Sequence, residues 1–327
     1  DVTESAGLSS LWTSLGATWG DFRNNGLPDL FVSNLGNSQL FRNNGDGTFT
    51  DVSRSAGIDA PGICSASLCC DIENDGWLDI VQFTYSRPQD AIYTLEHGHG
   101  PVGGSPMRVL RNNRDGTFTN IAPELGLKGC WGTMSGAAGD ATNSGHLDLF
   151  LGNGDPSIDR TEASILLEGN GQQFRNVTFS AGMPFTGKGH GVNMADLTGD
   201  GRLHLIVGSG GLYPGDLLTT TVHRPTKLPG NYLNVRLVGT QSNRDAVGAR
   251  LKLRSDGVDQ YRIVSSGSGF GCLPFEQHFG LGTLDEIEFL EIRWPSGHQQ
   301  VLESLPINDT ISIVEGQESF EAVYAHH

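Results

Sequence analysis

Short apolar runs alternate with acidic, glycine-containing loops along most of the chain. The clearest runs are LFVSN at 30–34, DIVQF at 79–83, LDLFLGN at 147–153 and LHLIVGS at 203–209. Runs of this length, bounded by glycine, asparagine and aspartate, are typical of buried β-strands. Apolar residues at the 3.6-residue period of an amphipathic helix are scarce. The pattern therefore predicts an all-β protein.

A nine-residue acidic segment adjoins the start of each apolar run. The four copies are DFRNNGLPD at 21–29, DIENDGWLD at 71–79, DATNSGHLD at 140–148 and DLTGDGRLH at 196–204. Glycine takes the sixth place in every copy. Self-similarity of this kind is the signature of a repeat architecture.

A second motif follows three of the acidic segments and completes the repeat. It reads LFRNNGDGTFTDVSRSAGI from Leu40, VLRNNRDGTFTNIAPELGL from Val109 and LLEGNGQQFRNVTFSAGM from Leu166. Its Asp-Gly turn is a strong hairpin signal, because both residues tolerate positive φ. Four strands per repeat predict β-propeller blades in residues 1–215. The first residues, DVTESAGL, repeat the tail of the motif, as in a ring with a split blade.

The acidic segments carry the oxygen ligands that calcium prefers. Ca²⁺ takes about six to eight oxygens, and ligands at places 1, 3, 5 and 9 of such a loop, with a backbone carbonyl at place 7, converge on one point. The candidate ligands are Asp71, Glu73, Asp75 and Asp79 in the second segment, Asp140, Thr142, Ser144 and Asp148 in the third, Asp196, Thr198 and Asp200 in the fourth, and Asp21, Asn25 and Asp29 in the first. We expect more than one structural Ca²⁺ ion, with affinities toward the weak end, on the order of 10⁻⁴–10⁻³ M.

Two segments depart from this ligand pattern. Arg23 stands at the third place of the first segment, and His204 stands at the ninth place of the fourth. Our hypothesis is that the Arg23 guanidinium folds into the first loop and replaces the ion beside its carboxylates. The alternative for all four segments is that the aspartates only form Asx-type turns without metal. Four aligned copies favour metal, most strongly in the second segment.

The acidic segments and the motif that follows them resemble the FG-GAP, or VCBS, repeats of integrin-like propellers. Further along the chain, NYLNVRLVGTQSNRDAVGARLKL (231–253), HFGLG (278–282), RWPSG (293–297) and SIVEG (312–316) look like an ASPIC/UnbV domain. The combination resembles the cartilage acidic protein family. The resemblance implies a secreted or envelope propeller with calcium in its acidic loops, followed by an ASPIC/UnbV-like β domain at 231–316.

Apolar and alternating runs predict the strands of this C-terminal domain. They lie at 232–238, 247–254, 258–264, 287–293, 299–305 and 310–315. Such strands form either a small β-sandwich or about two further blades. We expect them to pack on the propeller or to complete its ring.

Charge narrows the range of partners. The chain has 37 acidic and 21 basic side chains, with a net charge of −16, which repels nucleic acid and anionic lipid. No apolar stretch is long enough for a membrane-spanning helix, so we expect no membrane insertion. We expect a secreted or extracytoplasmic monomer that binds a protein or glycan partner.

An enzyme is the alternative function. Propellers bind small molecules where the first strands of the blades line the channel, and if alternation holds, residues six and two places before each loop face the same side. These residues are Leu15, Ser65, Met134 and His190, and Trp19, Cys69, Ala138 and Met194. A cyclase, isomerase or lyase of a natural-product pathway would hold its small-molecule ligand at this channel mouth, with His190 as acid or base. Channel packing is the simpler explanation.

An insertion at 84–107 lengthens the second repeat. It carries His97 and His99, a His-x-His pair that two ligands alone do not make into a metal site. We expect a glycine-rich flexible loop there.

Overall fold

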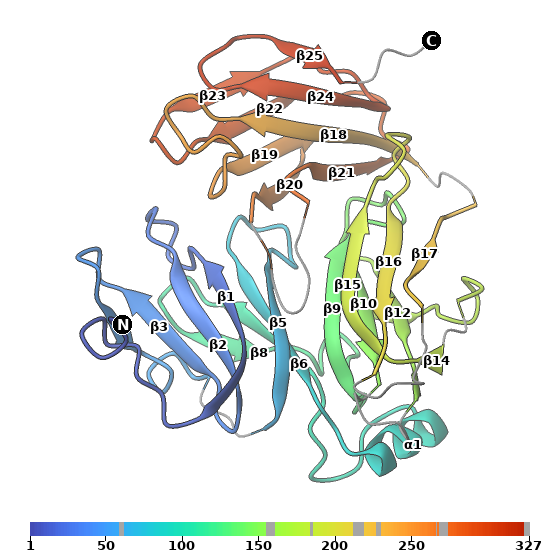
Figure 1. Cartoon of the computed structure of the whole chain (residues 1–327). Helices are drawn as coiled ribbons and strands as arrows, with labels where there is room; N and C mark the ends of the chain where they lie inside the picture. The colour runs from blue at the N-terminus through green and yellow to red at the C-terminus, as the bar shows by residue number, and fades with distance from the viewer. Residues whose placement is uncertain are drawn as a thin grey trace.

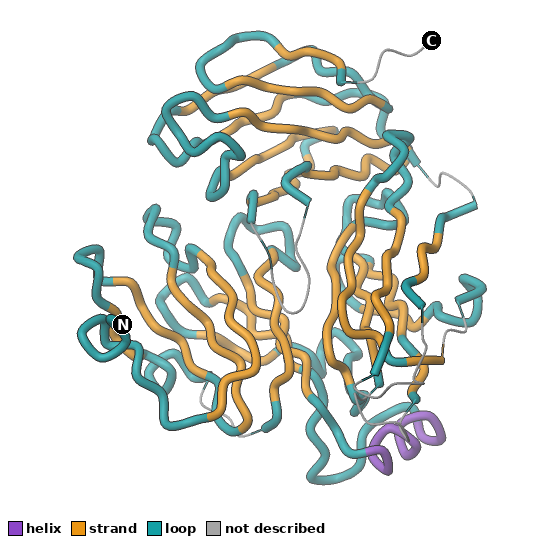
Figure 2. The backbone as a smooth tube through the Cα atoms, in the orientation of Figure 1, coloured by secondary structure: helices purple, strands orange, loops and turns teal. Residues whose placement is uncertain are grey.

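The computed structural model describes the whole chain except residues 59–61, 155–160, 184–185, 212–218, 227–229, 266, 268–273 and 324–327. Cys272 and the two C-terminal histidines lie outside the described residues. The described residues form small sheets and one helix (Figures 1 and 2). The prediction of an all-β protein is therefore confirmed.

Each repeat folds as one antiparallel sheet whose strands lie in chain order. The first contains β1 (Thr13–Gly20), β2 (Asp29–Leu35), β3 (Gln39–Asn43) and β4 (Phe49–Asp51). The second contains β5 (Cys64–Cys70), β6 (Asp79–Thr84), β7 (Arg108–Asn112) and β8 (Phe118–Asn120). The third contains β9 (Thr133–Gly139), β10 (Asp148–Asn153), β12 (Ile165–Gly169) and β13 (Phe174–Asn176), beside a short pair, β11 (Glu162–Ala163) and β14 (Thr186–Gly187). The fourth contains β15 (Gly189–Ala195), β16 (His204–Ser209) and β17 (Thr221–His223).

Neighbouring sheets pack face to face through apolar side chains. The buried Phe31 and Leu40 of the first sheet meet Ile80 of the second, and separate clusters join the second to the third and the third to the fourth. The first strands lie side by side, β1 against β5, β5 against β9 and β9 against β15. No comparable contact joins β15 back to β1 in the described parts of the chain. The described repeats thus form an arc of four sheets rather than a closed ring.

The tail of each repeat docks on the outer strand of the next sheet. The Phe49 amide donates to the Ala6 carbonyl over 2.8 Å, and the Phe118 amide donates to Ala56 over the same distance. The Phe174 amide donates to Leu125 over 2.9 Å. The segment at 1–8 therefore occupies the place of a repeat tail, which agrees with its sequence.

The C-terminal part is a sandwich of two four-stranded sheets. One sheet has the order β21 (Gln277–Gly282), β18 (Asn231–Val238), β24 (Asp309–Val314) and β25 (Phe320–Ala322), and the other has the order β20 (Val258–Ile263), β19 (Arg250–Ser255), β22 (Phe289–Arg293) and β23 (Gln299–Leu302). β18 and β24 are parallel, and a single apolar core lies between the two sheets. Figure 1 shows this sandwich lying across one end of the repeat sheets. The sandwich packs on the repeats and supplies no further sheet to the arc, so the expectation that it completes a ring is not met.

A buried carboxylate closes one end of this sandwich. Oε2 of Glu315 accepts hydrogen bonds of 2.8 Å from the backbone amides of Thr240, Gln241 and Ser242. Oε1 accepts from the Ser242 and Ser296 hydroxyls. Burial alone would raise the pKa of Glu315, but these donors outweigh it and hold the pKa well below its ordinary value. RWPSG and SIVEG are thus brought together by one side chain.

Two expectations about the repeats are wrong. The insertion at 84–107 contains a helix, α1 (Pro88–His97), which starts with a proline in its first turn and ends at Gly98 in the left-handed conformation. A β-bulge also lies at the sixth residue before each acidic loop, that is at Leu15, Ser65, Met134 and His190. A bulge adds one residue to the strand and breaks the alternation of side chains between its two faces. Alternation therefore does not place the residues six and two places before a loop on the same side.

Candidate functional site

The four acidic segments share one backbone conformation. In each, the first aspartate accepts hydrogen bonds from the amides of the fifth and sixth residues, as Asp71 does from Asp75 over 2.9 Å and from Gly76 over 2.7 Å. The sixth glycine has φ between 78° and 89° in all four copies, which a side chain would strain. Asp79, at the ninth place, accepts from Ile72 within the loop and from Asn112 on the third strand. These bonds come from amides four and five residues ahead and from a neighbouring strand, not from two residues ahead as in an Asx-type turn, and they fix the carboxylates in place.

The loops differ in their basic neighbours. In the first loop Arg23 forms a two-pronged ion pair with Asp29, with N–O distances of 3.0 and 3.2 Å, as the replacement hypothesis requires. In the fourth loop both Arg202 and Arg224 pair with Asp200. His204 lies 3.0 Å from the Arg202 carbonyl through Nδ1.

The second loop also has arginine neighbours, whereas the third has none among the described ion pairs. Arg114 pairs with Asp75 over 2.6 Å in the second loop, although Arg114 is half-exposed, and Arg111 lies 4.0 Å from Glu73. In the third loop the Thr142 hydroxyl lies 3.2 Å from both Ser144 Oγ and Asp148 Oδ2. No ion pair to a third-loop acid occurs among the described residues. The third loop is thus the acidic loop with the least internal compensation.

Burial makes the carboxylates of these two loops costly to ionise. It raises the pKa of Asp71 to about 6 and that of Asp79 to about 7, and in the third loop it raises the pKa of Asp148 to about 7. The negative charges of Asp71 and Asp75 raise the pKa of Asp79 further. Groups of this kind favour a nearby cation, because a cation stabilises the ionised form.

Calcium fits the chemistry of these donors. Every candidate side chain in the second and third loops ends in oxygen, the donor atom that Ca²⁺ prefers. The described residues contain no group of three or more His, Cys, Asp or Glu side chains that could hold a metal ion by themselves. Hydroxyl and backbone oxygens would therefore have to complete the ligand set.

A fourth-place asparagine, which the sequence analysis overlooked, links each loop to the next. The Asn24 amide donates to the carbonyl of Gly76 over 3.0 Å, Asn74 to Gly145 over 2.9 Å, and Asn143 to Gly201 over 3.1 Å. Each acceptor is the sixth-place glycine of the following loop. The three asparagines have φ between 51° and 54°, a left-handed conformation that asparagine tolerates. The sequence signal for this link is the asparagine repeated at the fourth place of the first three segments.

The C-terminal sandwich contacts these loops through the same asparagines. Arg250 of β19 reaches Asn24 and the Gly76 carbonyl, and Arg262 of β20 lies 3.3 Å from the Asn74 amide oxygen. His278 of β21 lies 2.7 Å from Asn143 through Nε2.

Backbone and side chains of β18 and β21 complete the contact. At the third loop a β-carbon on Gly280 would lie 2.0 Å from Asp140 Oδ2, so the strand backbone lies directly on the loop. At the fourth loop Asn234 donates to Asp196 Oδ2 over 2.9 Å. All four loops therefore contact one domain.

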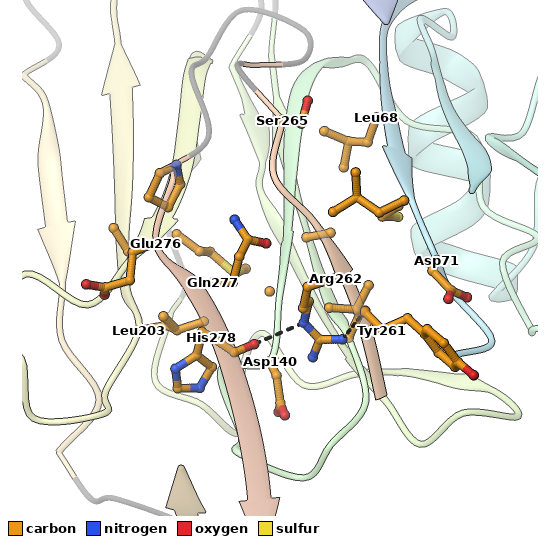
Figure 3. Close-up of a pocket in the computed structure, with 18 of the residues that line it drawn as sticks. Leu68, Asp71, Asp140, Leu203, Tyr261, Arg262, Ser265, Glu276, Gln277 and His278 are labelled. Carbon is orange, nitrogen blue, oxygen red and sulfur yellow. Dashed lines mark hydrogen bonds between the residues drawn. The ribbon is translucent and has the colours of Figure 1, made fainter. Parts of the chain in front are cut away.

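A cavity of about 120 Å³ lies between the loops and the sandwich (Figure 3). Its walls include Cys69, Ala138 and Met194 from the first strands and Arg262 and Gln277 from the sandwich. Arg262 donates to the carbonyls of His278 and Tyr261, over 2.9 and 2.8 Å, and burial lowers its pKa. Cys69, Ala138 and Met194, which stand two places before the second, third and fourth loops, thus line one cavity as expected. Trp19, the corresponding residue before the first loop, does not line it.

The other predicted site residues lie elsewhere. His190 is a bulge residue of β15 and is not among the residues that line this cavity. His97 stacks on Tyr93 with ring centroids 4.1 Å apart, and its ring lies 6.3 Å from that of His99. Figure 1 places α1 at the end of the repeats opposite the sandwich. The histidines of the insertion therefore lie away from the acidic loops and the sandwich.

Two parts of the chain match known protein families. Residues 21–81 match the FG-GAP-like repeat, and residues 239–320 match ASPIC and UnbV. The chain thus carries an FG-GAP-like repeat followed by an ASPIC/UnbV domain, which confirms the resemblance noted in the sequence. No described helix is long and apolar enough to cross a membrane.

The chain is similar to particular proteins over most of its length. It is 28% identical to cartilage acidic protein 1 of Mus musculus over 96% of the chain and 47% of that protein. It is 30% identical to cartilage acidic protein 1 of Homo sapiens over 91% of the chain and 43% of that protein. The chain therefore spans less than half the length of these relatives.

Similarity to solved structures is weaker. One match is described as the structural basis of specific recognition of non-reducing terminal N-acetylglucosamine by an Agrocybe aegerita lection. It is 18% identical, covers 92% of this chain and 83% of that chain, and has a TM-score of 0.36. A TM-score this low supports no functional conclusion.

Proposed function

We propose that this protein is a secreted or extracytoplasmic interaction module whose acidic loops bind Ca²⁺ and hold the C-terminal sandwich in place. Its partner is a protein or a glycan. The similarity to cartilage acidic protein 1 and the net charge of −16 support this proposal. The repeat sheets are proposed to be blades of a β-propeller, which the side-by-side packing of their first strands supports.

One observation carries the structural part of the proposal. The nine-residue segments that bear the carboxylates also bear the fourth-place asparagines that contact the sandwich. An ion that stiffens a loop therefore also stiffens the contact between the two parts of the molecule. Such an ion compensates buried negative charge and is structural.

Calcium is proposed for the second and third loops. Asp71, Glu73, Asp75 and Asp79 are proposed to hold it in the second loop once Arg114 moves aside and the side chains close on the ion together with backbone oxygens. Moving Arg114 costs little because exposed ion pairs contribute only about 0–1 kcal/mol. Asp140, Thr142, Ser144 and Asp148 would hold it in the third. In the first and fourth loops arginines already compensate Asp29 and Asp200 and are proposed to take the place of the ion.

Thermal unfolding of chelator-treated protein during Ca²⁺ titration tests the proposal. A ligand that binds only the folded state raises the unfolding midpoint. We expect a rise for the native chain, a smaller one for Asp148→Asn or Asp75→Ala, and an unchanged one for the control Asp115→Asn, whose carboxylate lies in an exposed hairpin. A midpoint that ignores Ca²⁺ in all four proteins, with no metal found by elemental analysis, would refute the calcium proposal.

The enzyme alternative receives no support from the described residues. The cavity beneath the sandwich, at about 120 Å³, is smaller than the roughly 300–1,000 Å³ typical of small-molecule sites, and His190 is not on its wall. The exposed surface of the repeats is therefore the more suitable place for a partner.

A further inference from the structure

A groove on the first repeat sheet combines an exposed tryptophan with fixed polar groups. Its volume is about 610 Å³, and its walls include Trp12, Asn37, Gln39, Asp51 and Arg54. The Trp12 side chain is 46% exposed. Such a combination of an aromatic face with a few convergent polar groups is typical of small-ligand sites.

The indole of Trp12 packs on the backbone of Gly36. Its six-membered ring lies against Gly36, where a β-carbon would be only 2.3 Å from Cε3. The Trp12 backbone amide also donates to the Ser10 hydroxyl over 3.1 Å, and that hydroxyl donates to Gln39 Oε1 over 2.6 Å. A fixed aromatic ring loses little conformational entropy when a ligand binds to it.

The polar groups beside the indole are also fixed. Gln39 Nε2 donates to Asp51 Oδ2 over 2.9 Å, and Asp51 Oδ1 accepts from the backbone amide of Ser53. Burial raises the pKa of Asp51, but hydrogen bonds from Ser53 and Gln39 outweigh it and leave the pKa below its ordinary value. Asp51 is therefore ionised at neutral pH and can accept hydrogen bonds from a ligand.

The other repeats lack this combination. Trp131 occupies the place of Trp12 in the third repeat, but there it packs against the apolar core between two sheets. The residues in the places of Gln39 and Asp51 are Arg108 and Asn120 in the second repeat and Ile165 and Asn176 in the third. Packing of the sheets alone therefore does not require the groups found in the first repeat.

We propose that this groove binds a single pyranose unit of a glycan. The aliphatic C–H face of a sugar ring stacks on an exposed indole, and its hydroxyls donate to a carboxylate and exchange hydrogen bonds with amides. Arg54 lies at the same groove and supplies donors for the ring or hydroxyl oxygens. The inference rests on the proposed function, since it names the ligand class of the interaction module and its place.

Nuclear magnetic resonance with simple sugars tests the site. The probes are methyl glycosides of the common neutral hexoses and N-acetylhexosamines at millimolar concentration, with a proline-rich peptide as the competing class. The chain has five tryptophans, and each indole N–H resonance is assigned by substitution. We expect at least one glycoside to shift the Trp12 indole resonance, and the affinity to fall about tenfold in Trp12→Ala and less in Trp12→Phe.

A matched variant tests whether the response comes from the groove or from any exposed tryptophan. Trp19 is 48% exposed but does not line the groove, so Trp19→Ala should bind the same glycoside as the native chain does. Absence of any glycoside response, a response that survives Trp12→Ala, or a response to the peptide alone would overturn the inference. The Ca²⁺ titration is independent of these outcomes, so a failed sugar site and a failed calcium proposal are distinguishable.

Discussion

Asn143 offers the most direct test of how the loops and the sandwich are joined. Its side chain is 1% exposed and bridges three segments. Nδ2 donates to the carbonyls of Gly201 and Gly230, over 3.1 and 3.3 Å, and Oδ1 accepts from His278. Asn143→Ala removes all three contacts and leaves buried partners without a bond.

The expected loss can be estimated from these contacts. An unsatisfied buried polar group costs about 1–3 kcal/mol. The left-handed backbone of residue 143, with φ of 51°, adds about 1 kcal/mol when alanine replaces asparagine. Because partners relax and find water, we expect Asn143→Ala to lower the free energy of unfolding by about 3 kcal/mol in total.

Urea unfolding, followed by tryptophan fluorescence, measures this difference. Asn143→Gly keeps the backbone conformation and loses only the side chain, so it should cost about 1 kcal/mol less than alanine. Asn113→Ala is the control, since Asn113 also makes two 3.0 Å hydrogen bonds to threonine hydroxyls, but both partners belong to its own hairpin. A loss below about 0.5 kcal/mol for Asn143→Ala, or one equal to that of Asn113→Ala, would refute the bridging role.

Three further changes test other parts of the structure. Gly280→Ala would place a β-carbon 2.0 Å from Asp140 Oδ2, so urea unfolding should show a loss of about 1–3 kcal/mol, and an unchanged midpoint would contradict the close docking of β21. Glu315→Gln should cost about 1–3 kcal/mol at pH 7, because an amide nitrogen would then face amide and hydroxyl donors. The pKa of Glu315 is lowered in the folded state, so its carboxylate stabilises the fold above its unfolded pKa of about 4.3, and this stabilisation is lost as the pH falls toward the folded pKa. The unfolding curves of the native and variant chains should therefore converge at low pH. Curves that stay equally separated at all pH values would contradict this. Arg23→Asp places an oxygen ligand at the third place of the first loop, and calorimetric titration should then show additional bound Ca²⁺; unchanged stoichiometry would reject the replacement hypothesis.

Local sequence patterns predicted the repeats well. The apolar run at 30–34 lies within β2, and the Asp-Gly turns precede β4 and β8, because strand periodicity and turn chemistry act over a few residues. In the C-terminal part the predicted runs correspond to strands of the sandwich, whereas β21, which contains HFGLG, was not predicted as a strand. Two of the five residues of that motif are glycine, which weakens a strand signal.

Contacts over long sequence distances could not be predicted in the same way. Alternation along the first strands failed at His190 because a bulge is set by how neighbouring strands pair. The helix α1 was missed because its buried residues are Asp90, Ala91 and Thr94 while Ile92 and Leu95 are exposed, so no apolar stripe at the helical period marks it.

The repeat, its acidic loops and the residue types that each loop offers can be read from the sequence, since each of these depends on residues within one nine-residue segment. Contacts between distant segments place the sandwich on all four loops, pair Arg224 with Asp200 and bring Trp12 and Asp51 to one groove. These relations join residues up to 226 positions apart, as the pairs Arg224 and Asp200, 24 positions apart, and Arg250 and Asn24 show. The fourth-place asparagine belongs to both levels, because its backbone conformation is local while its partners come from the next loop and from the sandwich.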